Sequence, residues 1–161
     1  MPNAKKQIVI IKVENKAGVL SKVTALCRRR RYNIQSLTVG TTNQPGISQI
    51  TVVFEEDKDR INQIANQINK LIEVINIEVA EPKDVIDKEL VLLIVKNKKI
   101  ADRFLEKTTH NIEIKIINSY EDQPIMQIIG SGTEVEHFID ELDLENEVVK
   151  LVRSGLIALK I

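Results

Sequence analysis

The residues best suited to chemistry lie in the junction Asn15-Lys16-Ala17-Gly18, between an apolar β-branched run and a helical pattern. A glycine at a helix start leaves backbone N–H groups pointing outward, and these groups with the helix dipole favour an anion. The junction contains one glycine and lacks both nucleotide-binding patterns, Gly-x-Gly-x-x-Gly and the Gly-Lys-Ser/Thr ending. The alternative is that Gly18 only supplies a tight strand-to-helix turn.

A free amino acid fits this junction better than a nucleotide does. Its carboxylate needs donors such as the N–H groups, and its ammonium needs an acceptor such as an Asn side chain. Asn15 precedes the predicted helix and Asn33 follows it, so one chain places them about 20 Å apart. The two asparagines would share a ligand only where two chains meet, each giving one of them, as at a two-fold interface.

Other polar and reactive residues give weaker signals. The run Arg28–Arg31 falls at the end of the predicted helix, where cations complement the helix dipole. A nucleic-acid patch and a contact for an acidic partner protein remain as alternatives. His110 and His137 have no second ligand at metal spacing, and Cys27 lies on the apolar helix face. The sequence therefore predicts no catalytic residue and no metal site in this chain.

Composition narrows the class of protein. The 161 residues contain 23 Lys plus Arg against 23 Asp plus Glu, so no global field attracts nucleic acid or an anionic membrane. Aromatic residues make up only 3%, which leaves few faces for stacking bases. A single cysteine excludes an intramolecular disulfide, and the apolar run Ile8–Ile11 is shorter than a signal peptide core. These features predict a cytoplasmic protein.

The first half of the chain alternates between strand and helix patterns in the order β-α-β-β-α-β. Asp57 is the predicted N-cap of the second helix. Its apolar face comprises Ile61, Ile64, Ile68 and Leu71. Strands are expected at 8–13, 33–40, 47–54 and 74–80, and the first helix from residue 19.

The second half repeats this order after a charged segment, 81 to about 89, that reads as a linker. Thr133 and Glu136 form a predicted capping box, and Ser119–Gln123 a polar loop. The fold class is therefore α+β, with two ferredoxin-like βαββαβ domains at 1–80 and 81–161. Strands are expected at 90–95, 112–117, 124–130 and 147–152, with helices around 100–105 and 135–142 and an apolar tail after Arg153-Ser154-Gly155.

Four stretches, "VENKAGVLSKVTALCRRRRYNIQSLTVG", "NQINKLIEVINI", "KELVLLIVK" and "VVKLVRSG", resemble in order the small, regulatory subunit of acetolactate (acetohydroxyacid) synthase. The resemblance implies that 1–80 is an ACT domain whose side-by-side dimer holds a feedback inhibitor, typically valine. It implies that 81–161 helps to dimerise and to dock the catalytic subunit. Ser21 falls at a position that the family associates with loss of feedback inhibition. The implied effector-binding residues are Asn15, Ala17, Gly18, Val19 and Leu20 from one chain and Asn33 and Ile34 from the other.

The resemblance places the chemistry in a partner. The catalytic subunit would hold thiamine diphosphate, Mg and FAD and would condense pyruvate into acetolactate for branched-chain amino acid synthesis. This chain would have no cofactor of its own, would raise that activity, and would lower it again when valine binds. The Arg28–Arg31 run is more basic than the family pattern, and "TTHNIEIKIINSYEDQ" diverges from it.

Three other functions remain open at this stage. The chain would alternatively be a stand-alone ACT-domain amino-acid sensor acting on another partner, a nucleic-acid binder, or a purely structural dimer module. The sequence does not rank valine against leucine or isoleucine, because one methylene discriminates by only about 1–3 kcal/mol.

Overall fold

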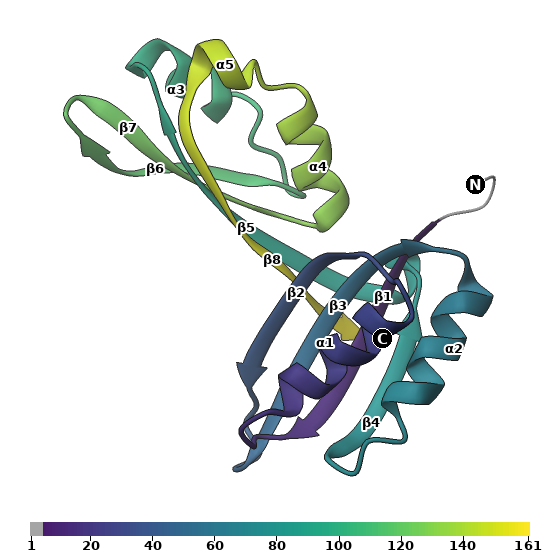
Figure 1. The fold of residues 1–161 in the computed structure, drawn as a ribbon. Coiled ribbons are helices and arrows are strands. Elements are labelled where there is room, and N and C mark those ends of the chain that lie inside the picture. Colours follow the sequence, from purple (N-terminus) through teal and green to yellow (C-terminus); the bar gives the residue numbers. More distant parts are fainter. Residues whose placement is uncertain (1–4) are drawn as a thin grey trace. The chain divides into compact units, whose positions relative to one another are not determined.

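The computed structural model describes residues 5–161 as two compact units (Figure 1). The first unit comprises the described residues up to Ile86 together with Leu156–Ile161, and the second comprises Asp87–Gly155. The boundary between the units lies after Ile86, whereas the predicted boundary was at residue 80. The last six residues, predicted in the second domain, belong to the first unit.

The first unit has a four-stranded sheet in the order β2-β3-β1-β4, with every neighbouring pair antiparallel. This strand order, together with the two helices that connect strands of the sheet, confirms the predicted βαββαβ fold. The elements are β1 (Lys5–Glu14), α1 (Val19–Arg29), β2 (Ile34–Thr41), β3 (Ile47–Glu56), α2 (Lys58–Ile68) and β4 (Val74–Ala80).

Both helices cover one face of this sheet (Figure 1). Alternate residues of β1 point to that face because side chains alternate along a strand. The predicted apolar face of α2 is confirmed, although Leu71 lies beyond the helix end at Ile68. Asp57 is the N-cap residue, but its side chain makes no capping hydrogen bond. The core on this face includes Val9, Ile11, Val13, Val19, Val23, Cys27, Phe54, Ile61, Ile64 and Ile68.

The C-terminal segment Leu156–Ile161 packs on the opposite face of the same sheet. Ser36 Oγ accepts a hydrogen bond from Leu156 N at 3.1 Å, and Thr38 Oγ1 donates to Leu156 O at 2.8 Å. Leu156 and Ala158 are buried here, where the sequence predicted only an apolar tail. They cover Ile8, Ile10, Val53, Ala80 and Val85, which would otherwise face water.

The second unit has a sheet in the order β6-β7-β5-β8 and confirms the second ferredoxin-like copy. Its core contains an edge-to-face contact between the rings of Phe104 and Phe138, with centroids 5.5 Å apart. The short helix α5 is an addition to the predicted pattern. The elements are β5 (Val85–Val95), α3 (Lys98–Leu105), β6 (Glu113–Tyr120), β7 (Gln123–Gly130), α4 (Gly132–Asp140), α5 (Leu144–Glu147) and β8 (Val148–Lys160).

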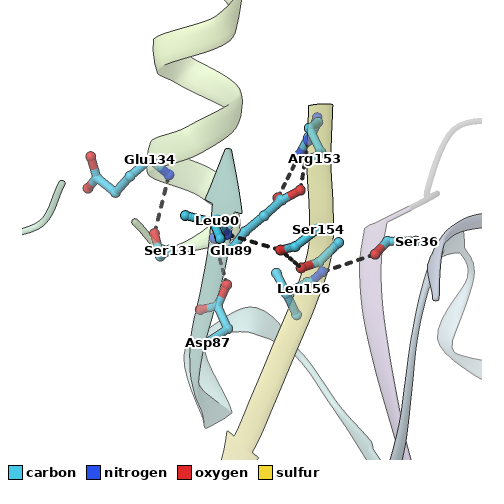
Figure 2. A network of polar contacts seen from close by, with 11 residues as sticks. Ser36, Asp87, Glu89, Leu90, Ser131, Glu134, Arg153, Ser154 and Leu156 are labelled. Atoms are coloured by element: carbon cyan, nitrogen blue, oxygen red, sulfur yellow. Dashed lines mark hydrogen bonds and ion pairs between the residues drawn. The ribbon is translucent and has the colours of Figure 1, made fainter. Parts of the chain in front are cut away.

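The predicted linker 81–89 is wrong for most of its length. A single 3₁₀ turn, Pro82–Asp84, is followed directly by β5. Glu89 is only 4% exposed and receives two hydrogen bonds from Arg153, each 2.7 Å long (Figure 2). One of the charges that suggested a linker is thus a buried carboxylate, and its partner lies 64 residues away in the sequence.

Two local predictions in the second half are also corrected. Ser131, and not Thr133, caps α4, because its Oγ accepts a hydrogen bond from Glu134 N at 3.2 Å. The predicted loop Ser119–Gln123 shrinks to the turn Glu121-Asp122, whose φ angles are 49° and 65°. Two successive left-handed residues make the tight hairpin turn that matches strand twist.

Candidate functional site

Helix α1 begins after Gly18, which adopts a left-handed conformation with φ 86° and ψ −9°. Few residues other than glycine take this conformation without strain, so the turn from β1 into the helix depends on it. Asn15 N donates to Gly46 O at 2.8 Å and Lys16 N donates to Glu14 O at 2.8 Å, which fixes the loop. A Cβ added at Gly18 would meet no atom within 4 Å, so the position faces open space.

The start of α1 presents free backbone donors. Within residues 5–161, no acceptor takes the N–H groups of Ala17, Gly18, Leu20 or Ser21. The N–H of Val19 reaches only Lys16 O, at 3.4 Å. The first turn carries no acidic side chain. This arrangement favours a carboxylate, because the donors and the positive end of the helix dipole act together.

An ion pair involves a residue in the same turn of α1 as these donors. Lys22, in the first turn of α1, forms an ion pair with Glu73, which lies in the turn before β4. Glu73 also accepts Glu14 N through its main-chain oxygen at 2.9 Å, and its Oε2 is buried without a hydrogen-bond partner. A buried, unsatisfied carboxylate oxygen is uncommon and suits a cationic ligand group. Glu73 was not predicted from the sequence, because it lies 51 positions after Lys22 and no local pattern links the two residues.

The Lys22 ammonium, by its hydrogen bond, lowers the pKa of Glu73, although burial acts in the opposite direction. Because the folded-state pKa is lowered, the carboxylate stabilises the fold above its usual pKa range and loses that effect as the pH falls through the lowered value. We expect Lys22→Met to reduce the free energy of unfolding at neutral pH, and this reduction to become smaller as the pH falls through the lowered pKa of Glu73.

Urea unfolding of wild type and Lys22→Met, carried from neutral pH into the acid range, measures the difference in the free energy of unfolding. Lys70→Met removes another exposed lysine and serves as the control. A difference between wild type and Lys22→Met that stays constant down to the acid limit would contradict this assignment.

Asn33 and Ile34 lie at the other end of α1. Asn33 is exposed, and Ile34 opens β2, pairs with Phe54 and packs against the core. The 11 residues of α1 separate this end from Gly18 by about 16 Å. The structure therefore groups Asn15 with the Ala17–Ser21 segment, and within one chain it does not bring Asn33 to them.

The remaining candidates fall outside this site. Cys27 is 1% exposed, which confirms its predicted place on the apolar face of α1, and burial raises the pKa of its thiol. His110 and His137 are exposed. Among residues 5–161, no group of three or more His, Cys, Asp or Glu side chains is arranged to hold a metal ion. No helix in that range is long and apolar enough to span a membrane.

Two ferredoxin-like βαββαβ units, the first with unpaired backbone donors at the start of α1, define the class of protein. Residues 9–76 match the family model described as AHAS small subunit-like ACT domain, and residues 88–161 match that of the small subunit of acetolactate synthase. The chain belongs to the acetolactate synthase small-subunit family.

Individual relatives agree along nearly the full chain. The chain is 36% identical over 155 residues to a probable acetolactate synthase small subunit of Archaeoglobus fulgidus, covering 96% of each. It is 29% identical to the acetolactate synthase small subunit of Bacillus subtilis, covering 95% of this chain and 89% of that one. Among solved structures, the acetolactate synthase small subunit from Thermotoga maritima is 31% identical, with a TM-score of 0.83 and 98% of both chains covered.

Proposed function

We propose that this chain is the regulatory subunit of an acetolactate synthase, which activates a thiamine-diphosphate-dependent catalytic subunit and confers feedback inhibition by valine or another branched-chain amino acid. The unpaired N–H groups at the start of α1, in a chain of this family, are the observation that carries the proposal. The catalytic partner supplies the cofactors and the chemistry, and this chain supplies effector binding. We place the complex in the cytoplasm, in agreement with a single buried cysteine.

The strand directions support a site shared by two copies. β1 and β2 are both antiparallel to β3, so their C-terminal ends lie at the same end of the sheet. β2 is an edge strand, free to pair with β2 of a second copy. A two-fold axis perpendicular to the sheet makes the two β2 strands antiparallel, and the partner copy's β2 then begins where this copy's β2 ends.

That pairing brings together the two groups that one chain keeps apart. Asn33, just before β2 of the second copy, would lie at the sheet end where Asn15 follows β1. The N–H groups would take the effector carboxylate, and the side-chain carbonyl of Asn33 from the second copy would accept a hydrogen bond from its ammonium. A carboxylate at a helix N-terminus is stabilised by about 0.3–1 kcal/mol. Feedback inhibition requires a coupling free energy between the effector site and the docking surface of only about 1–3 kcal/mol.

Asn33→Ala is expected to weaken valine binding by about 1–3 kcal/mol, because it removes one partner of a polar pair. This corresponds to a rise in Kd of roughly 5- to 150-fold. Isothermal titration of valine into each variant measures the change. Asn62→Ala, which removes an exposed Asn from α2, should bind like wild type. Unchanged affinity in Asn33→Ala would contradict the role of Asn33 in the shared site.

The experiment for the function as a whole is a pyruvate-consumption assay of the cognate catalytic subunit. Adding this chain should raise the rate, and titrating valine, leucine or isoleucine should lower it toward that of the catalytic subunit alone. Activation without a response to any of the three would support a docking role alone. No activation would contradict the proposal.

A further inference from the structure

The four consecutive arginines Arg28–Arg31 place more positive charge at the end of α1 than is needed to complement the helix dipole. All four side chains are exposed, and none of them forms an ion pair with another described residue. One or two cations in the last turn complement the dipole, but four adjacent ones repel each other. α1 ends at Arg29, and Arg31 turns the chain in a left-handed conformation with φ 58°.

A pocket of about 310 Å³ opens next to this run, between the end of α1 and one side of α2. Arg30 is one of its lining residues, and α2 contributes three residues that carry side-chain amides. Tyr32 forms a fixed wall, because its hydroxyl donates to Arg60 O at 2.7 Å and the Arg60 guanidinium lies 4.8 Å from its ring centroid. The lining residues are Arg30, Tyr32, Gln63, Ile64, Asn66 and Gln67.

The chemistry of this surface suits an acidic peptide. Guanidinium groups bind carboxylates through two parallel hydrogen bonds, and side-chain amides match the donors and acceptors of a peptide backbone. A nucleic acid would need stacking faces, and the only ring here already contacts Arg60. The chain's net charge of zero supplies no wider field for a polyanion.

We propose that an acidic segment of the catalytic partner docks on Arg28–Arg31, with one Asp or Glu side chain bound by Arg30 in the pocket beside Gln63 and Gln67. This inference rests on the proposed function, because that function supplies the partner.

The first test neutralises the run in the full chain. Arg28→Gln/Arg29→Gln/Arg30→Gln is titrated into the catalytic subunit, and the concentration giving half of the maximal pyruvate consumption is measured. We expect that concentration to rise on the order of 10- to 100-fold at low salt and the gap to close as salt screens the charges. The maximal rate at saturation should match wild type. Lys5→Gln/Lys12→Gln/Lys160→Gln removes three exposed charges from the same unit and should change little.

The second test adds a negative or a positive charge beside the pocket, at a position that is neutral in the wild type. Gln67→Glu should raise the half-saturating concentration about tenfold at low salt, and Gln63→Lys should lower it. Because the two substitutions act in opposite directions, a general loss of stability does not imitate the result.

The outcomes separate this inference from the proposed function. If wild type does not activate the catalytic subunit, both are overturned. If wild type activates and the triple arginine variant has a half-saturating concentration within twofold of it, only the docking surface is overturned. If the triple variant loses retention on RNA while activation is unchanged, the run is a nucleic-acid contact and the inference is again overturned.

Discussion

Gly18→Asp is expected to abolish the response to valine while leaving activation of the catalytic subunit intact. The new carboxylate would stand beside the free N–H groups of Gly18, Leu20 and Ser21, where the carboxylate of the effector must bind. A Cβ at this position meets no neighbouring atom within 4 Å, so the steric cost of the substitution is the strain of the left-handed backbone. Inhibition by saturating valine in the pyruvate-consumption assay should fall to the background level.

Gly18→Asn is the control that separates the effect of the negative charge in Gly18→Asp from the effect of backbone strain. Asn and Asp tolerate the left-handed conformation of Gly18 about equally, at a cost near 1 kcal/mol, and they have nearly the same shape. We expect Gly18→Asn to keep part of the valine response and Gly18→Asp to lose it. Equal loss in both variants would show that the turn, and not anion binding, matters here. Loss of activation in Gly18→Asp would show that Gly18 is structural.

Arg153→Ala is expected to destabilise the second unit by about 3 kcal/mol. The substitution leaves the carboxylate of Glu89, at 4% exposure, without its two charge-assisted hydrogen bonds. Breaking a buried pair costs about 3–5 kcal/mol, and the partial exposure of Arg153 places the effect at the lower end of that range. In a unit of this size the loss lowers Tm by roughly 10–20 °C.

Hydrogen exchange resolved by peptide locates the effect. Peptides from β5 and β7 should lose protection, whereas peptides from β3 should keep theirs. Glu89→Leu/Arg153→Leu removes both charges and should be more stable than Arg153→Ala. Lys150→Ala, at an exposed position of β8, is the control for substitution in that strand. Full protection of the second unit in Arg153→Ala would mean that the buried pair contributes little.

The periodicity of apolar residues was sufficient to predict the repeated βαββαβ order, because each strand and helix buries one face. It was not sufficient where distant residues decide a local structure. The charged residues around Glu89 predict a linker, but a partner 64 residues away, Arg153, allows Glu89 to be buried in β5. The apolar tail Leu156–Ile161 is visible in the sequence, but its place on the first sheet is not, because the hydrogen-bond partners of Leu156 lie 118 and 120 residues away. Contacts between residues so far apart in the chain leave no recognisable pattern in the sequence around either residue.

Some residues of the candidate site could be predicted from the sequence, and others could not. Asn15 and Gly18 stand out from the sequence because strand and helix patterns meet there. Asn33 is found by the same reasoning at the other end of the helix. Glu73, whose buried Oε2 has no partner, carries no such signal, because only the turn before β4 brings it to Lys22. Likewise, the Arg28–Arg31 run is visible in the sequence, but the amides of α2 that line the pocket beside Arg30 are not.

A mixed-dimer titration tests most directly whether two copies share each effector site. Gly18→Asp and Asn33→Ala chains, each impaired alone, are unfolded together in equal amounts, refolded and titrated with valine. In a mixed dimer one site receives both substitutions and the other receives neither, so random pairing should restore about one quarter of the wild-type number of sites at wild-type affinity. No restored tight binding in the mixture would mean that each site lies within a single chain, which contradicts the account.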